Sequence, residues 1–186
     1  SVPIRAGAFE FLCRSVITAP TLAEAIRRSI RFLRLVLPDL AVRLASNDEQ
    51  ACLCIRETRP LKIGRVFAFE WLLRLLHGLL SWLVGRSIVL ESVAFPYPRP
   101  AHAEDYALIY TAHSTFDAET LSAIFAANLL DLPIRRDEAA LQAFLDGAPG
   151  KLTTLYRRDR EMVLRVRNAL RDALPASGSL GDVASA

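Results

Sequence analysis

The sequence predicts an α+β domain in which helices pack on a small, mostly antiparallel sheet. Three observations predict this class: helical apolar spacing at both ends of the chain, short strand-like runs between them, and one long apolar segment in the middle. The 186 residues suit one domain, or one domain plus a fragment, and a content of 52% hydrophobic residues is sufficient for a sizeable core.

Two helices are expected near the amino terminus. Apolar residues recur at helical intervals over residues 5–17, and a second helix is expected from Leu22 to about Leu37. TLAE (Thr21 to Glu24) is a capping-box pattern, with threonine at the cap and glutamate three residues later. The second helix therefore begins after Thr21, with an apolar side and an arginine-rich side.

Four segments are expected to form strands. Leu40–Ala45 and Ala51–Glu57 flank the polar turn SNDEQ, and Ile88–Phe95 alternates well enough to be a third strand. Leu121–Ala126 is expected to pair with the segment near Ser114–Phe116. Strand pairs between terminal helices favour the α+β class over a parallel α/β fold.

The other elements are short helices separated by prolines and glycines, and the longest of them, near the carboxy terminus, is amphipathic. Its period does not distinguish a helical connection between domains from a dimer contact. The expected helices are Glu104–Tyr110, a turn in NLLDLP that ends at Pro133, a helix capped by Asp137 that runs through Leu145, and, after GAPG, Lys151–Tyr156 and Asp159–Leu174.

The segment Phe67–Gly85 is apolar and close to the length of about 20 residues that crosses a bilayer. It contains Glu70 and Arg74, and an arginine at the bilayer centre costs about 2.5–3.5 kcal/mol. We therefore expect a long buried central helix that begins near Gly64 and ends at Gly85 as at a glycine cap, and no membrane contact.

This helix has one narrow polar seam, formed by Glu70, Arg74, His77 and Ser81. One interpretation is an exposed stripe with an i,i+4 ion pair. The other is a ligand cavity, in which Arg74 pairs with a carboxylate or phosphate, Glu70 holds Arg74 or an amine, and His77 adds a pH-sensitive hydrogen bond. The candidate ligand-binding residues are Glu70, Arg74, His77, Trp71, Trp82 and Phe67.

Arginine supplies nearly all the positive charge behind the net charge of +3, because the chain has only two lysines. One interpretation is a set of solvated helix faces and loops; another is an anion site. Arg27-x-x-x-Arg31 resembles the phosphate clamp of PilZ-type cyclic-dinucleotide receptors, and direct DNA contact is disfavoured because acidic residues are interleaved. The alternative anion-binding residues are Arg27, Arg31, Arg59 and Arg65.

Motifs for catalysis, cofactors and metals are missing from the sequence. There is no G-x-S-x-G, H-E-x-x-H, Walker loop or G-x-G-x-x-G, so we expect no enzyme and no cofactor. The three cysteines have no framework spacing for disulfides, and buried apolar thiols are favoured over a three-thiol metal site. Cys52 and Cys54 would point the same way from one strand, and a reduced, cytoplasmic protein without a signal peptide is expected.

FPYPRPAHAEDY is expected to be a rigid connection or the mouth of a pocket. Its prolines set its path, Tyr97 and Tyr106 are expected to pack, and His102 is expected to cap the short helix that follows.

The last residues, PASGSLGDVASA, resemble a hinge followed by the first helix of the helix-turn-helix domain of AraC-type transcription regulators. The preceding chain resembles the amino-terminal effector domain of the AraC branch named after arabinose binding. The stretches that carry this resemblance are VPIRAGAFEFLCRSVITAPTLAEAIRRSIRF, RVFAFEWLLRLLHGLLSWLVGR, VAFPYPRPAHAEDYALIY, ANLLDLPIRRD and FLDGAPGKLTTLYRR.

The resemblance implies a cytoplasmic regulator that senses a small-molecule effector, forms a homodimer and contacts DNA only through a carboxy-terminal domain. It implies an effector-binding and dimerisation domain over residues 1–158, a helical linker over 159–178 and the first residues of a truncated helix-turn-helix domain over 179–186. A module that dimerises without any ligand is the alternative from another class.

Overall fold

The computed structural model describes residues 7–146. The chain divides into two units, Ser1–Leu155 and Tyr156–Ala186, and every described residue belongs to the first. The helices expected over 151–156 and 159–174, the linker over 159–178 and the segment 179–186 lie outside the described residues.

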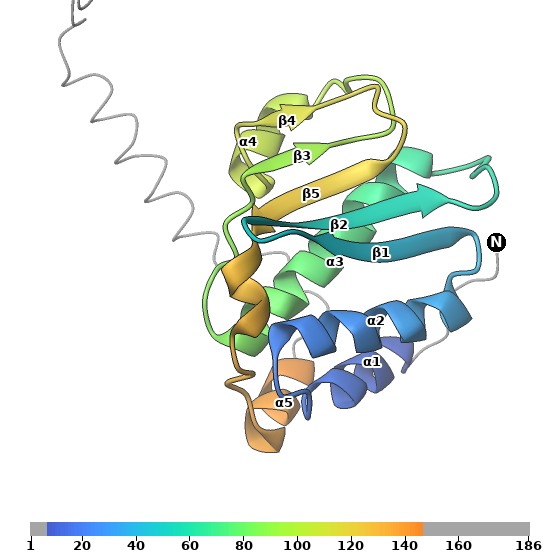
Figure 1. Ribbon diagram of the computed structural model, residues 1–186. Helices are drawn as coiled ribbons and strands as arrows, with labels where there is room; N and C mark the ends of the chain where they lie inside the picture. The colour runs from blue at the N-terminus through green and yellow to red at the C-terminus, as the bar shows by residue number, and fades with distance from the viewer. Residues whose placement is uncertain (1–6, 147–186) are drawn as a thin grey trace, which may run out of the picture. The chain divides into compact units, whose positions relative to one another are not determined.

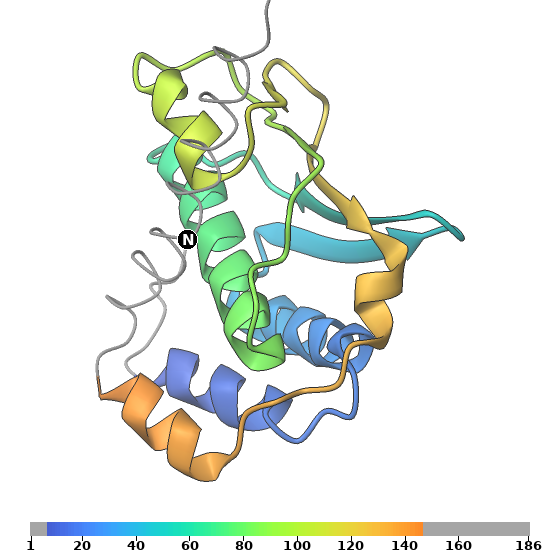
Figure 2. The ribbon, with the colours of Figure 1, turned by 90° about the vertical axis from the view of Figure 1, so that its left-hand side faces the viewer.

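The described chain is a sheet with helices on one face and at one end (Figure 1). Helix α3 runs along one face of the sheet, and α1, α2 and α5 gather at one end (Figure 2). The elements are α1 (Ala8–Val16), α2 (Leu22–Val36), β1 (Leu40–Ser46), β2 (Gln50–Glu57), α3 (Arg65–Val84), β3 (Ser92–Ala94), η1 (Ala103–Asp105), α4 (Tyr106–Ile109), β4 (Ser114–Thr115), β5 (Leu121–Ala126), η2 (Ala127–Asp131) and α5 (Glu138–Leu145).

The sheet has the strand order β1-β2-β5-β3-β4. Strands β1, β2, β5 and β3 are antiparallel to their neighbours, and β4 is parallel to β3. The expected α+β class with a mostly antiparallel sheet is therefore confirmed.

The expected pairing of β5 with the segment near 114–116 is wrong. Strand β5 lies between β2 and β3, and β4 pairs with β3 instead, where Val93 is opposite Ser114. The physical reason is burial: β2 and β5 are paired over six positions, and three of these pairs, among them Leu53 with Ala123, join residues that face the core. The apolar area buried by pairing β5 with β2 therefore outweighs the shorter chain closure of pairing β5 with the segment near 114–116. The regular strand in 88–95 is also shorter than expected, at Ser92–Ala94.

The helix ends predicted at Thr21, Gly85 and Asp137 are confirmed. Thr21 Oγ1 accepts a hydrogen bond from the Glu24 amide at 3.4 Å, and Asp137 Oδ1 accepts one from the Ala140 amide at 2.8 Å. Gly85 ends α3 at φ 73°, a left-handed conformation that glycine adopts without strain.

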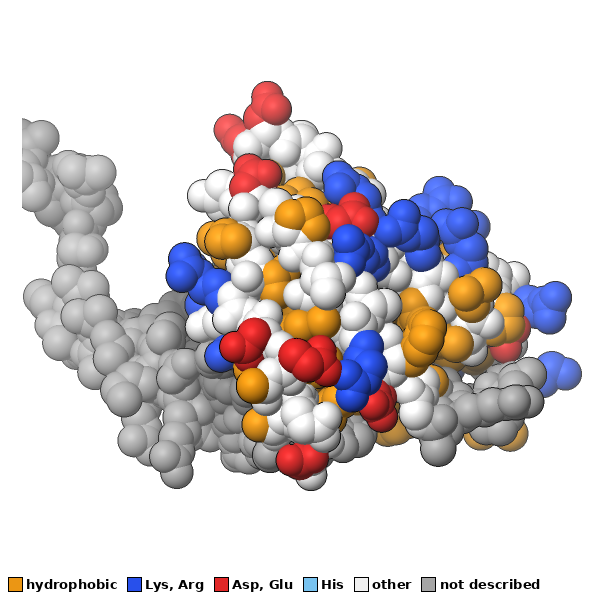
Figure 3. Space-filling view, turned by 90° about the horizontal axis from the view of Figure 1, so that it is seen from below, with side chains coloured by type: hydrophobic (Ala, Val, Ile, Leu, Met, Phe, Trp, Pro, Cys, Tyr) orange, Lys and Arg blue, Asp and Glu red, His pale blue; other side chains and the backbone are white. Residues whose placement is uncertain are grey.

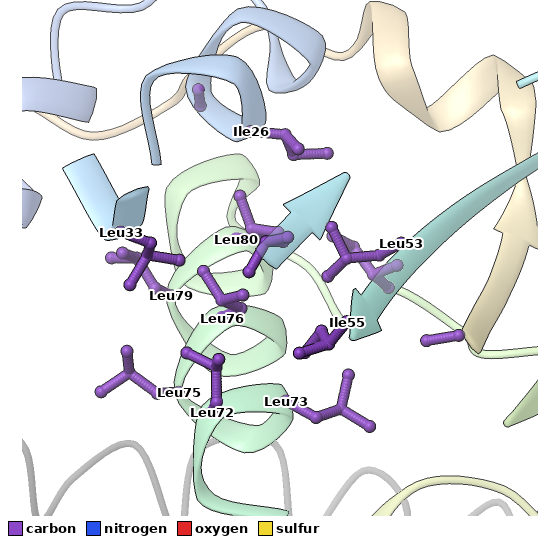
Figure 4. Close-up of a cluster of buried hydrophobic side chains, with 14 of the residues drawn as sticks. Ile26, Leu33, Leu53, Ile55, Leu72, Leu73, Leu75, Leu76, Leu79 and Leu80 are labelled. Atoms are coloured by element: carbon purple, nitrogen blue, oxygen red, sulfur yellow. The ribbon is translucent and has the colours of Figure 1, made fainter. Parts of the chain in front are cut away.

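Helix α3 is the core of the domain. It has the length of a membrane span, and an 18-residue window within it has a mean hydropathy of 1.3, but more than half of its 20 residues are buried inside the domain. Figure 4 shows its leucines among Ile26 and Leu33 of α2 and Ile55 of β2. Each fully buried leucine contributes about 1.5–3 kcal/mol, so the helix stabilises the fold as the expected core helix.

Candidate functional site

The polar seam of α3 lies under the chain that returns along it. Ile88, just after the helix, makes two contacts with this seam. Its carbonyl oxygen is 2.7 Å from His77 Nε2, and its amide donates to Ser81 Oγ at 3.2 Å. Hydrogen bonding to the backbone of one residue explains why an otherwise apolar helix has polar residues at these positions.

We call the chain that follows α3, residues 86–110, the return segment, and further along it side chains converge on Glu70. His102 Nε2 is 2.8 Å from Glu70 Oε1, and the Tyr106 hydroxyl donates to the same oxygen. The Tyr110 hydroxyl donates to the Glu70 carbonyl oxygen at 3.0 Å. We call Glu70, His102, Tyr106 and Tyr110 the Glu70 cluster. His102 makes no side-chain cap to the short helix, contrary to expectation, because its ring is bonded to Glu70 instead.

The inner side of the Glu70 cluster is buried and its outer side is accessible. Tyr106 is 1% exposed, whereas the side chain of Glu70 is 23% exposed and that of His102 is 51% exposed. Burial raises the pKa of Tyr106, and the hydrogen bond to Glu70 raises it further, so Tyr106 stays a neutral donor. The carboxylate of Glu70 therefore accepts a hydrogen bond from the buried phenol of Tyr106 on its inner side and contacts the exposed imidazole of His102 on its solvent side.

An aromatic group supports the cluster. The hydroxyls of Tyr97 and Tyr106 are 3.1 Å apart, and the ring of Phe95 contacts both tyrosines at centroid distances of 5.4 and 4.8 Å. Burial raises the pKa of Tyr97. The expected packing of Tyr97 and Tyr106 is confirmed, and both rings contact Phe95, one in a tilted and one in an edge-to-face arrangement.

The other residues proposed for the seam site lie in different surroundings. Arg74 and Trp71 are half-buried on α3 beside the cluster, and Phe67 is 67% exposed near the start of the helix. Trp82 is 7% exposed; its ring stacks on Phe144 at 4.2 Å. Trp82 is thus a core residue near the far end of α3 from Glu70.

Each of the four arginines proposed as an anion site faces a carboxylate. Arg27 and Arg31 are 3.5 and 3.0 Å from Glu24. Side-chain exposures of 61% and 65% leave both guanidinium groups accessible. Basic and acidic side chains also occur together on the face formed by α1, α2 and α5 (Figure 3).

The two remaining arginines lie apart from that pair. Arg59 is 3.9 Å from Asp39 and 79% exposed. Arg65 is 2.8 Å from Glu57 and also donates to the carbonyl of Pro96. The structure therefore does not gather the four arginines into one cluster.

A cavity that the sequence reasoning missed lies past the carboxyl end of α3. Its volume is about 350 Å³. The signal in the sequence was RSIVLE, in which two charges of opposite sign flank apolar residues directly after a glycine cap. The residues that line it are Arg86, Val89, Glu91, Ala126, Asn128, Leu129 and Leu132.

The described cysteines are thiols, and residues 7–146 hold no group of three metal-ligating side chains. Cys52 and Cys54 point to the same face of β2, with sulfur atoms 3.2 Å apart. This confirms the expected arrangement of the two side chains.

Comparison with known proteins assigns the sequence to a family of regulatory domains. Residues 1–134 match the family described as the arabinose-binding domain of AraC transcription regulators, at their amino terminus. The chain therefore belongs to this family, as the resemblance implied.

A curated relative agrees with this assignment. The ornithine utilization regulator of Pseudomonas aeruginosa is 27% identical over 165 residues, which cover 83% of this chain and 49% of that protein. The chain thus spans about half the length of the curated relative it matches.

Proposed function

We propose that this chain is the effector-sensing and dimerisation part of an AraC-type transcription regulator. In this proposal a small molecule binds the domain in the cytoplasm and controls DNA binding by a carboxy-terminal helix-turn-helix domain. Family membership over residues 1–134 supports it, as does the match to about half of a longer regulator.

The Glu70 cluster is the effector contact that the geometry supports best. The observation that carries this choice is that Glu70, on the core helix, accepts hydrogen bonds from two residues of the return segment, His102 and Tyr106. A ligand donor that takes the place of the exposed His102 would change how this segment is held. Arg74 and His77, further along α3 and flanked by Trp71, are the groups proposed to receive the rest of the ligand.

Signalling would then be a shift between two arrangements of the return segment. Such a ligand changes the regulator only if it prefers one arrangement over the other. Glu70 is the source of that preference, because His102 and the ligand would compete for a hydrogen bond to the same carboxylate oxygen of Glu70.

A thermal-shift screen of the 186-residue chain tests this proposal. The panel holds amino acids, including ornithine because of the relative's name, with sugars, aromatic acids, short fatty acids and cyclic dinucleotides. At a hundred times its dissociation constant a ligand adds about 2.7 kcal/mol, which raises the melting temperature by several degrees.

The screen is repeated with Glu70→Gln and with Glu104→Gln as the matched control, since Glu104 is an exposed carboxylate of the same segment. We expect the shift to disappear in Glu70→Gln and to persist in Glu104→Gln. A ligand whose shift is the same in both variants would exclude Glu70 as the contact.

An anionic nucleotide is the second candidate, favoured by the exposure of Arg27 and Arg31 one turn apart on α2. Its phosphates would have to displace Glu24. Cyclic di-GMP should then stabilise the chain, and the Arg27→Ala/Arg31→Ala variant should abolish the effect while Arg34→Ala, on the same helix, should not.

If no compound of the panel raises the melting temperature and light scattering shows a dimer, a dimerisation module without a ligand would be favoured instead.

A further inference from the structure

The cavity beyond the carboxyl end of α3 is built from two segments that are far apart in the sequence. Arg86, Val89 and Glu91 follow the helix, and Ala126 ends β5. Asn128, Leu129 and Leu132 come from η2 and the residue that follows it. A volume of about 350 Å³ is at the lower end of the range for small-molecule sites.

The charged residues in this cavity are of opposite sign and are not paired with each other. Within residues 7–146, no nitrogen of Arg86 lies within 4.0 Å of a carboxylate oxygen of Glu91. The guanidinium of Arg86 has no hydrogen-bond or ion-pair partner in the described part of the chain, and the same holds for the side-chain amide of Asn128. Two donor groups are therefore available at the cavity surface.

Glu91 is held in place but not saturated. Its Oε2 accepts one hydrogen bond, from Gln50 Nε2 at 2.7 Å, and its backbone amide donates to the carbonyl of Ile124 at 2.8 Å. A carboxylate has about four acceptor positions, so Glu91 keeps capacity for a cationic ligand group.

The rest of the wall is apolar. Val89, Leu129 and Leu132 line the cavity, and Val89 is 70% exposed. A ligand with an aliphatic part would cover these side chains and remove apolar surface from water.

We propose that this cavity binds a small zwitterion, an α-amino acid with an aliphatic side chain. The carboxylate of the ligand is held by the planar fork of Arg86 and by the amide of Asn128, and its ammonium group donates to Glu91. The aliphatic side chain lies against Val89, Leu129 and Leu132. Arg86 and Glu91 are both exposed, and a ligand with one charge would pair with only one of them, so a zwitterion makes one ion pair more than a singly charged ligand.

This site is separate from the effector contact proposed at Glu70. Fourteen residues of α3 lie between Glu70 and the end of the helix, a distance of about 21 Å at 1.5 Å per residue. The inference goes beyond the proposed function, because a second ligand site is assigned to the same domain.

Isothermal titration calorimetry of the 186-residue chain tests the proposal with three probes of similar shape. The probes are L-leucine, 4-methylpentanoate, which lacks the ammonium group, and 3-methylbutylamine, which lacks the carboxylate. We expect L-leucine to bind at least tenfold more tightly than either analogue. Equal binding of the three probes, or no binding of L-leucine, L-valine and L-methionine at 10 mM, overturns the proposal.

Variants locate the binding. Arg86→Ala should weaken L-leucine binding at least tenfold and leave the amine unaffected, while Glu91→Gln should weaken L-leucine and leave 4-methylpentanoate unaffected. Arg86→Lys, which keeps the charge but loses the fork, should give an intermediate affinity. Arg135→Ala and Glu119→Gln, exposed residues that do not line the cavity, are the matched controls and should bind L-leucine as the parent chain does.

The two proposals fail separately. L-Leucine binding that is lost in Glu70→Gln but kept in Arg86→Ala would overturn the cavity and support the Glu70 cluster. Loss of L-leucine binding in Arg86→Ala alone supports the cavity, whatever the effector screen finds at Glu70.

Discussion

His77 Nε2 lies 2.7 Å from the carbonyl oxygen of Ile88, so a side chain in the core helix binds the chain that leaves it. The amide of Ile88 donates to Ser81 Oγ, and Ser81 lies four residues after His77 on α3. The backbone carbonyl and amide of Ile88 are thus both hydrogen-bonded by the polar seam, and these two bonds hold the return segment against the helix.

The first prediction concerns Ser81, which is 1% exposed. Ser81→Ala removes the acceptor of the Ile88 amide and leaves a buried donor unpaired. We expect a loss of about 1–3 kcal/mol in the free energy of unfolding, measured by urea denaturation. Ser46→Ala, at an exposed serine of β1, is the control and should change stability by less than about 0.5 kcal/mol. Equal effects of the two substitutions would contradict the role assigned to Ser81.

The second prediction concerns the hydrogen bond between Glu70 and Tyr106. Because both atoms belong to one network, Glu70→Gln and Tyr106→Phe should not have additive effects. A double-mutant cycle by urea denaturation should give a coupling free energy of about 0.5–3 kcal/mol. Tyr106→Phe paired with Glu104→Gln, which is outside the network, should give coupling near zero. Additive effects in the first cycle would show that the contact contributes nothing.

The third prediction concerns pH. The hydrogen bond from Arg65 lowers the pKa of Glu57 below its ordinary value of 4.5. A depressed folded-state pKa contributes stability that is present above pH 4.5 and lost as the pH falls through the lower, folded-state value. In Glu57→Gln the free energy of unfolding should therefore fall less steeply below about pH 4.5. Glu119→Gln should keep the parent slope, and an unchanged slope in Glu57→Gln would refute the linkage.

The fourth prediction concerns the thiols. Burial raises the pKa of Cys13 to about 12, and burial together with the neighbouring Cys54 raises the pKa of Cys52 to about 12. Since the thiolate is the reactive form, both should react slowly with a disulfide reagent at pH 8 in the native chain. Cys13 and Cys52 should react at least tenfold faster in urea. Rapid native labelling at Cys13, located by mass spectrometry, would show that this part of the core opens.

The fifth prediction concerns the central helix. Leu79 is 0% exposed and lies in the core, whereas Leu35 on α2 is 82% exposed. Leu79→Ala should therefore destabilise the fold by about 2–5 kcal/mol, and Leu35→Ala should change it by less than about 0.5 kcal/mol. Denaturant midpoints of the two variants provide the measurement. A small effect at Leu79 would contradict the placement of α3 as the core helix.

The sequence predicted the residues that α3 contributes to the candidate site, but not their partners from the return segment. The helical period placed Glu70, Arg74 and His77 on one seam, because residues three and four apart share a helix face. Their partners were not predictable in the same way: His102 and Tyr106 are 32 and 36 positions from Glu70, and no local period relates them. For the same reason Trp82, grouped with the seam by its nearness in sequence, lies in the core against Phe144.

Local structure could be read from the residues alone: the helix that begins after Thr21, the helix that ends at Gly85 and the strands on each side of SNDEQ. These follow from caps, glycine conformations and alternation, which act between residues a few positions apart. The tertiary structure alone decided that β5 lies between β2 and β3, that the return segment covers the seam, and that Arg86 and Asn128 share a cavity. Burial of whole faces selects among long-range pairings, and that free energy depends on the complete fold rather than on neighbouring residues.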